Sequence, residues 1–209
     1  MPVLLDRKSQ TLPAYLTDHS TLGDVLKWAR TQLSDGRVIV QIQLGEQLLE
    51  GPALSRARRD TLGDATLTLV SADQKELALT MLGKLAALIQ WLTPQHKDVA
   101  GLLERGETKK GLERLAGILS AWQQIQDAYG NLAKLINLSL TDLPVHHLNG
   151  EDVLNEFCHQ LEEIQTALQN KDFVLLADIL QYEMEGAVVN WMALLEATLG
   201  EVEPTAATA

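Results

Sequence analysis

The spacing of the hydrophobic residues changes abruptly about a third of the way along the chain, and this change constrains the fold more than any other feature. In ATLTLV, residues 65–70, apolar and polar side chains alternate as in a half-buried strand, whereas DQKELALTMLGKLAALIQWL, residues 73–92, has helical spacing. A chain of 209 residues is long enough for two small domains. We therefore predict an α+β protein with one domain at 1–72, a helical domain at 73–199 and a disordered tail at 200–209.

The first domain is predicted to contain one helix and four or five strands. The helix, residues 21–33, begins at Thr21 with Asp24 at capping-box spacing, and Gly36 is well placed to end it. A single amphipathic helix has one apolar stripe to bury, and a twisted sheet offers one apolar face for that stripe. The strands are predicted from β-branched and alternating runs at 2–6, 11–16, 37–43, within 44–51 and at 65–70.

This order of elements resembles the ubiquitin-like β-grasp fold. The resemblance is carried by the helix TLGDVLKWARTQL, the strand–turn–strand VIVQIQLGEQLLEG and the closing segment DTLGDATLTLV. Ubiquitin-like carriers resemble one another in a free C-terminal Gly-Gly, which has no counterpart here. Instead SADQKEL follows the closing strand and starts a helix, which Ser71 or Asp73 can cap. We therefore expect a docking or structural module and not a conjugated carrier.

The second domain is predicted to be an antiparallel bundle of four to five helices. Apolar stripes run along 107–139 and 172–200 with polar residues opposite, a pattern typical of helical bundles. Pro94 is expected to end or kink the first helix, and LTDLPVHHLNG, residues 140–150, is expected to form a loop. The tryptophans at apolar helical positions are predicted to be core residues: Trp91, Trp122 and Trp191.

A second resemblance rests on NKDFVLLADILQYE, residues 170–183. This segment is similar to the NKDxVLLADxLxYE motif of a family of bacterial proteins of unknown function, in which a short β-containing region precedes a helical region. The resemblance covers most of the chain and implies this layout, but it implies no catalytic residue. The acidic helical half also resembles helical secretion or flagellar chaperones, in architecture alone.

Charge and cysteine content argue against several classes of function. The formal net charge of −11 opposes binding to nucleic-acid phosphates. The local basic cluster of Arg56, Arg58 and Arg59 is interpreted as a solvated turn, because short charge motifs are weak signals. Cys158 is the single cysteine, so no internal disulfide can form. No stretch predicts a signal peptide or a membrane span. We therefore expect a soluble cytoplasmic protein that binds neither nucleic acid nor a membrane.

The sequence contains no recognisable catalytic constellation. It has no phosphate-binding glycine loop and no Gly-x-Ser-x-Gly elbow. Glu156 and His159 form one Glu-x-x-His unit, but a di-metal site in a bundle requires two. Together with His146 or His147 of the loop, they are the candidate ligands of a single metal ion. No cofactor is predicted.

Two carboxylates inside helical segments were considered as candidate active-site groups. Asp178 shares a polar stripe with Gln181 and Glu185, whereas Glu183 falls on a mixed face. Both are interpreted as surface groups or as hydrogen-bonding partners between helices.

The sequence favours a non-enzymatic protein-interaction or chaperone-like adaptor with a protein partner. Its predicted binding surface is either a groove between helices that accepts an amphipathic helix or the outward face of the sheet. The outward residues predicted to contact a partner are Ile39, Gln41, Thr68 and Val70. The alternative function is a metal-binding or enzymatic bundle that uses Glu156 and His159. Homodimerisation through the helical half is also consistent with its long apolar stripes.

Overall fold

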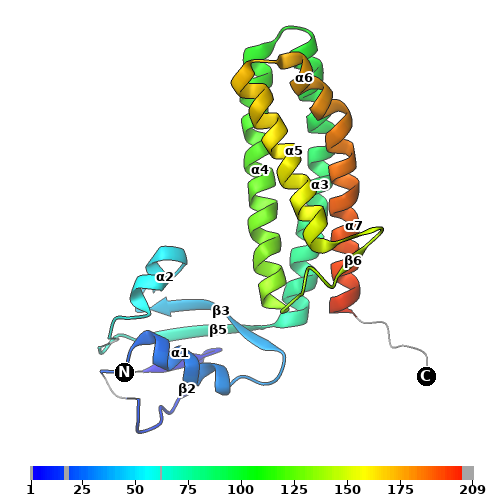
Figure 1. Ribbon diagram of the computed structural model, residues 1–209. Coiled ribbons are helices and arrows are strands. Elements are labelled where there is room, and N and C mark those ends of the chain that lie inside the picture. The colour runs from blue at the N-terminus through cyan, green and yellow to red at the C-terminus, as the bar shows by residue number, and fades with distance from the viewer. Residues whose placement is uncertain (1, 17–18, 62, 204–209) are drawn as a thin grey trace, which may run out of the picture. The chain divides into compact units, whose positions relative to one another are not determined.

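The computed structural model describes residues 2–16, 19–61 and 63–203 (Figure 1). The chain divides into two compact units, Met1–Leu77 and Ala78–Ala209. The architecture is α+β, with a five-stranded mixed sheet in the first unit followed by helices. Of the predicted tail, residues 200–202 belong to the last helix and residues 204–209 lie outside the described residues.

The sheet of the first unit has the strand order β2-β1-β5-β3-β4. The central strands β1 and β5 are parallel, and the other neighbouring strands are antiparallel. The strands are β1 (Val3–Leu5), β2 (Lys8–Gln10), β3 (Arg37–Leu44), β4 (Gln47–Leu48) and β5 (Leu67–Asp73). The alternation of Leu67 and Leu69 with polar residues therefore marks the middle of the sheet, where both residues are fully buried.

Strand β2 does not lie at 11–16, where the sequence predicted it. Asp6 and Arg7 have positive φ angles of 50° and 65°, and they form the turn between Leu5 and Lys8, which pair across the hairpin. A two-residue turn with positive φ at both positions matches the twist of antiparallel strands. The second strand therefore begins directly after the turn, at Lys8.

Helix α1 (Leu22–Thr31) packs against the apolar face of this sheet. The predicted capping box is confirmed, because the side chain of Thr21 accepts a hydrogen bond from the backbone N–H of Asp24 and the Asp24 carboxylate accepts one from the Thr21 N–H. Four residues of α1 enter the core of the first unit: Leu22, Val25, Leu26 and Ala29. A short helix, α2 (Gly51–Ala57), includes Arg56 of the basic cluster, and Arg58 and Arg59 follow it in a turn.

A bulge in β3 changes which of its residues face outward. The register between β3 and β5 shifts between Ile39 and Gln41, so Ile39 pairs with Ser71 while Gln41 pairs with Val70. Ile39 consequently packs against the core of the first unit. Its predicted place on the outward face is wrong, because an extra residue in a strand reverses the facing of the residues beyond it. Gln41, Thr68 and Val70 do share the outward face.

A polar cluster, here called the Asp6 clamp, ties three strands together through Ser71. The backbone N–H and the hydroxyl of Ser71 donate to the Asp6 carboxylate at 2.7 and 2.6 Å. Arg37 donates from Nε to the Ser71 hydroxyl at 2.9 Å and from Nη2 to the Ser71 carbonyl at 2.8 Å. These hydrogen bonds from Ser71, assisted by the Arg37 charge, hold the pKa of Asp6 below its usual range.

Strand β5 ends at Asp73 and helix α3 (Gln74–Glu104) begins at the next residue. The Asp73 carboxylate accepts a hydrogen bond from the backbone N–H of Glu76 at 3.0 Å. Asp73 therefore caps the helix, which was one of the two alternatives predicted.

Within the described residues six helices follow the sheet, counting the π-helix, whereas four to five were predicted. They are α3, α4 (Thr108–Leu135), α5 (Gly150–Asn170), α6 (Phe173–Asp178), the π-helix η1 (Ile179–Glu183) and α7 (Met184–Val202). Figure 1 shows α3, α4, α5 and the continuous α6–η1–α7 segment lying side by side. A short hairpin of β6 (Pro144–Val145) and β7 (Leu148–Asn149) occupies the predicted loop. The different count reflects two physical causes, of which the first joins two expected helices into one and the second divides one expected helix into three.

The first cause is that Pro94 does not end α3. A proline at this position removes the hydrogen bond to the carbonyl of Gln90. Both residues lie on the exposed side of the helix, where water can replace the missing donor. The second cause is that the expected last helix, 172–200, changes to π geometry at Ile179 and back to α geometry at Met184. Periodicity alone does not reveal either effect.

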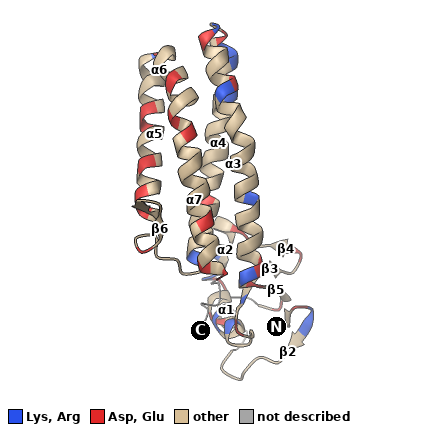
Figure 2. Ribbon diagram, turned by 90° about the vertical axis from the view of Figure 1, so that its right-hand side faces the viewer, with Lys and Arg blue, Asp and Glu red and all other residues tan. Residues whose placement is uncertain are grey.

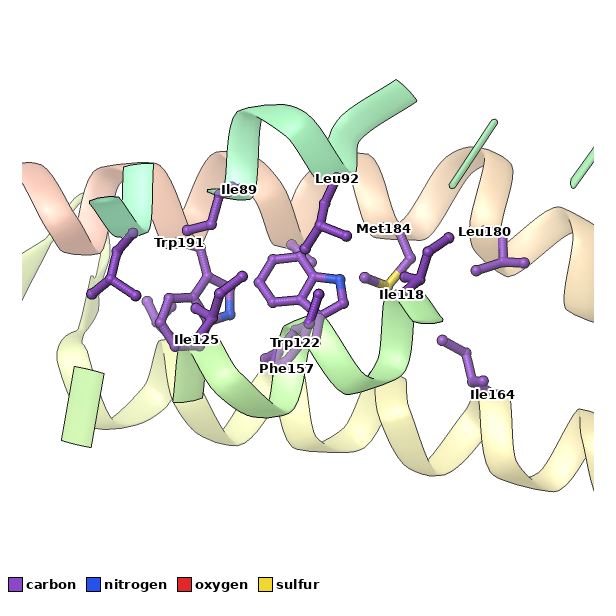
Figure 3. Close-up of a cluster of buried hydrophobic side chains, with 14 of the residues drawn as sticks. Ile89, Leu92, Ile118, Trp122, Ile125, Phe157, Ile164, Leu180, Met184 and Trp191 are labelled. Atoms are coloured by element: carbon purple, nitrogen blue, oxygen red, sulfur yellow. The ribbon is translucent and has the colours of Figure 1, made fainter. Parts of the chain in front are cut away.

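The core of the second unit is built around an aromatic cluster (Figure 3). Trp122 and Trp191 are fully buried, with ring centroids 5.8 Å apart, and Phe157 and Tyr129 contact Trp191 edge to face. Such tilted contacts are the favourable geometry for aromatic rings. The prediction is confirmed for these two tryptophans and is wrong for Trp91, which is 57% exposed.

Candidate functional site

An apolar groove lies between α3 and α7 in the second unit. It has a volume of about 750 Å³. Of the residues that line it, only His146 and Glu196 carry a polar or charged side chain. The others are Leu79, Leu82, Gly83 and Ala86 of α3 and Val188, Val189, Met192, Ala193, Leu195 and Leu199 of α7. A concave, largely apolar surface with few polar groups is typical of binding sites.

The groove remains unfilled because small side chains lie between large ones along the two helices. Gly83 and Ala86 alternate with leucines on α3, and a Cβ atom added to Gly83 would meet nothing within 4 Å. Ala193 lies on the opposite wall. Val189 and Leu199 remain 56% and 39% exposed. Large aliphatic side chains with this exposure form an exposed hydrophobic patch. The contact of such a patch with water is unfavourable, and exposed patches of this kind mark interaction sites.

Helix α3 contributes more apolar surface than the core of its unit uses. Its most apolar 18-residue window has a mean hydropathy of 1.3, and only 28% of that window is buried. By length and composition α3 is the one helix among the described residues that is long and apolar enough to cross a membrane, a test that core helices of globular proteins also pass. Since a core helix is mostly buried, the exposed apolar surface calls for a different explanation.

An ion pair connects α3 and α7 beyond the groove, toward the C-terminal end of α3. Lys97 Nζ lies 3.2 Å from Glu185 Oε2, with both side chains about half exposed. Such a pair contributes little to stability. It does establish which levels of α3 and α7 face each other.

Beneath this ion pair, His96 is buried against the aromatic cluster. The indole N–H of Trp122 donates to Nε2 of His96 at 3.0 Å, and the two rings are stacked. Burial lowers the pKa of His96 to about 4. Its Nε2 is therefore an acceptor at neutral pH, and the histidine acts as a core residue.

The candidate metal ligands do not converge. His159 lies 3.3 Å from Glu162, and Glu156 accepts a hydrogen bond from Asn190 at 3.3 Å. His146 lines the apolar groove and the adjacent His147 is exposed. Within residues 2–16, 19–61 and 63–203, no three His, Cys, Asp or Glu side chains come together in a way that could hold a metal ion.

The two helical carboxylates lie at the surface around the π-helix. Asp178 is exposed, while Glu183 lies against Glu163 of α5. Partial burial, together with the charge and hydrogen bond of Glu163, raises the pKa of Glu183. The π-helix thus places Glu183 in contact with Glu163, and among the described residues no group of three His, Cys, Asp or Glu side chains that could hold a metal ion forms there.

The position of the groove was not predicted, although a groove between helices was. The available signal was α3 itself, in which Leu79, Leu82 and Ala86 share one face while Leu88 and Trp91 lie on another side of the helix. A helix that is apolar on several sides has more surface than one core can bury.

A family model described as a domain of unknown function (DUF8042) matches residues 80–194, which is more than half of the chain. The match lies within the helical unit and includes most of α3 and α7. No curated protein and no solved structure matches the chain.

Proposed function

Because the chain belongs to the DUF8042 family, whose function is unknown, we propose from its structure that it is a non-enzymatic protein-interaction protein. Its binding site is the groove between α3 and α7, and its ligand is an amphipathic helix of a protein partner. The observation that carries this proposal is the groove itself, whose walls are apolar apart from His146 and Glu196.

The groove suits an amphipathic helix for geometric and chemical reasons. Two helices packed side by side leave a long groove between them, into which the apolar stripe of a third helix fits. The small side chains of Gly83, Ala86 and Ala193 allow the incoming helix to approach closely. A charged or strongly polar ligand would find only His146 and Glu196 to bind it.

The first unit, in this proposal, is a ubiquitin-like β-grasp module of structural or docking character. The order β2-β1-β5-β3-β4, the parallel central pair and the packing of α1 on one face support this assignment. Its outward face, with Gln41, Thr68 and Val70, is a second surface on which a protein can dock. The exposed free thiol of Cys158 supports a reducing compartment, such as a bacterial cytoplasm.

The test is capture of a stoichiometric partner by the tagged full-length protein at low and moderate salt. Val189→Asp places a charge in the groove, whereas Val174→Asp places the same charge on α6, where Val174 is 75% exposed. We expect Val189→Asp to abolish capture and Val174→Asp to preserve it. Failure of the unmodified protein to retain any partner, including another copy of itself, contradicts the proposal. Equal effects of the two variants would contradict the assignment to the groove.

A further inference from the structure

Resting on the function proposed above, we propose that the helix received by the groove is α7 of a second copy of this chain. In this arrangement α7 of each copy lies against α3 of the other, around a twofold axis that runs along the helices of the second unit. The contact is isologous, so every interaction occurs twice. The argument depends on the relative levels of charged residues on the two walls.

The ion pair between Lys97 and Glu185 establishes these levels. From Lys97 back to Lys84 is thirteen residues along α3, and from Glu185 on to Glu196 is eleven residues along α7. With a rise of about 1.5 Å per residue, these distances are about 20 Å and about 17 Å. Because the helices are antiparallel, Lys84 and Glu196 lie at nearly the same level on opposite walls. A twofold axis along the helices keeps this level unchanged in the second copy.

Both of these charged residues lack an ion-pair partner within the described part of the chain. Glu196 lines the groove, so an apolar helix lying there would remove water from its carboxylate. The twofold arrangement places α3 of the second copy over Glu196, at the level of its exposed Lys84. The chain therefore supplies the counter-charge that any other partner helix would have to provide.

The distribution of the remaining charge permits two copies to approach through this face. Most of the net charge of −11 belongs to the helical unit, where residues 78–209 carry eight Lys and Arg against eighteen Asp and Glu. Five of those acids lie on α5, which has no Lys or Arg, whereas α3 carries equal numbers of both signs. Figure 2 shows the acidic residues along α5 and long uncharged stretches of α3. Helix α5 does not line the groove, so its five acids stay away from the proposed contact. Helix α7 carries three acids and no Lys or Arg, and in this arrangement it lies against α3 of the other copy, whose charges are balanced.

The experiment measures the mass of the full-length protein by sedimentation equilibrium or light scattering at about 1 to 100 μM, the range of an ordinary homodimer. We expect a dimer that dissociates on dilution. Lys84→Glu and Glu196→Lys each replace two attractive pairs per dimer by two repulsive ones, and each should raise the dissociation constant at least about tenfold. The double variant restores opposite charges across the contact and should recover most of the lost affinity. A change in folding alone would not produce this recovery, and helix content by circular dichroism monitors folding.

Two outcomes overturn the proposal. A monomer throughout this range shows that no second copy fills the groove. If Val189→Asp nevertheless abolishes capture of a different partner, the proposed function stands while this inference fails. A dimer that Val189→Asp leaves intact, or a double charge variant no better than the single ones, shows that the copies associate through another surface.

Discussion

The buried histidine predicts a specific loss of stability in mild acid. His96 has a pKa of about 4 in the folded protein, against 6.5 for an unperturbed histidine. Because the folded state binds the proton less tightly than the unfolded state, the neutral form of His96 favours folding above pH 6.5. This contribution decreases as the pH falls below 6.5 and is fully lost near pH 4, where the folded protein also takes up the proton.

The magnitude follows from the difference between the two pKa values. A separation of about 2.5 pH units corresponds to about 3.4 kcal/mol, and about 2.5 kcal/mol of this is lost between pH 7 and pH 4.5. The structural cause is the indole N–H of Trp122, which points at Nε2 of His96 from 3.0 Å. A protonated His96 would set one donor against another in a site from which water is excluded.

The assay compares the unmodified protein with His96→Gln by urea unfolding at several pH values, monitored by tryptophan fluorescence and circular dichroism. The amide oxygen of glutamine can accept the Trp122 hydrogen bond but does not titrate. We expect the variant to be less stable at pH 7 by about 1 to 2 kcal/mol, from imperfect packing, but to lose about 2.5 kcal/mol less on going to pH 4.5. His159→Gln is the matched control, since His159 is highly exposed. Parallel pH profiles for the unmodified protein and His96→Gln would refute the reasoning.

Three further predictions concern other described contacts. Asp6→Asn should destabilise the first unit by about 1 to 3 kcal/mol, because the buried Ser71 loses a charge-assisted acceptor; urea unfolding measures this, and an unchanged midpoint would contradict the role of the Asp6 clamp. Trp191→Phe should cost less than the usual truncation of a core tryptophan, about 1 kcal/mol or less, because its buried indole N–H has no acceptor among the described residues and the substitution removes that unpaired donor; a loss above about 3 kcal/mol in the same assay would contradict this expectation. The raised pKa of Glu183 means that the folded state holds this proton more tightly, so the Glu183 contribution to stability is greatest at low pH and decreases as the pH rises through the raised value. Glu183→Gln, which also removes repulsion from Glu163, should therefore raise the melting temperature at pH 7 but not at pH 4, and an equal change at both values would argue against the pair.

Residues whose environment is set locally were predictable from the sequence. The capping box of Thr21 and Asp24 uses two side chains three positions apart, and the Asp73 cap needs only its own helix. Apolar spacing likewise identified Trp122 and Trp191 as core residues. These features depend on chain neighbours and on one face of one helix.

The incorrect predictions concern places where the regular geometry of a helix or of a strand pair is interrupted. The bulge before Gln41 moved Ile39 to the core side, and the π geometry from Ile179 to Glu183 divided a helix that looked continuous. Pro94 failed to end α3 because the lost hydrogen bond lies on the exposed side. The groove depends on which face of α3 its neighbours leave open, and periodicity within α3 does not contain that information.

The π-helix has a consequence for how the coding sequence can vary. A π turn closes its hydrogen bond one residue later than an α turn, so η1 holds one residue more than a regular helix would at that point. The difference between the present α6–η1–α7 segment and an uninterrupted α-helix is therefore one codon. We expect its deletion to keep Leu176 and Trp191 on the core face and to move Glu183 relative to Glu163. A single in-frame deletion would thus change the acidic surface around Glu183 without changing the faces of α6 and α7 that enter the core.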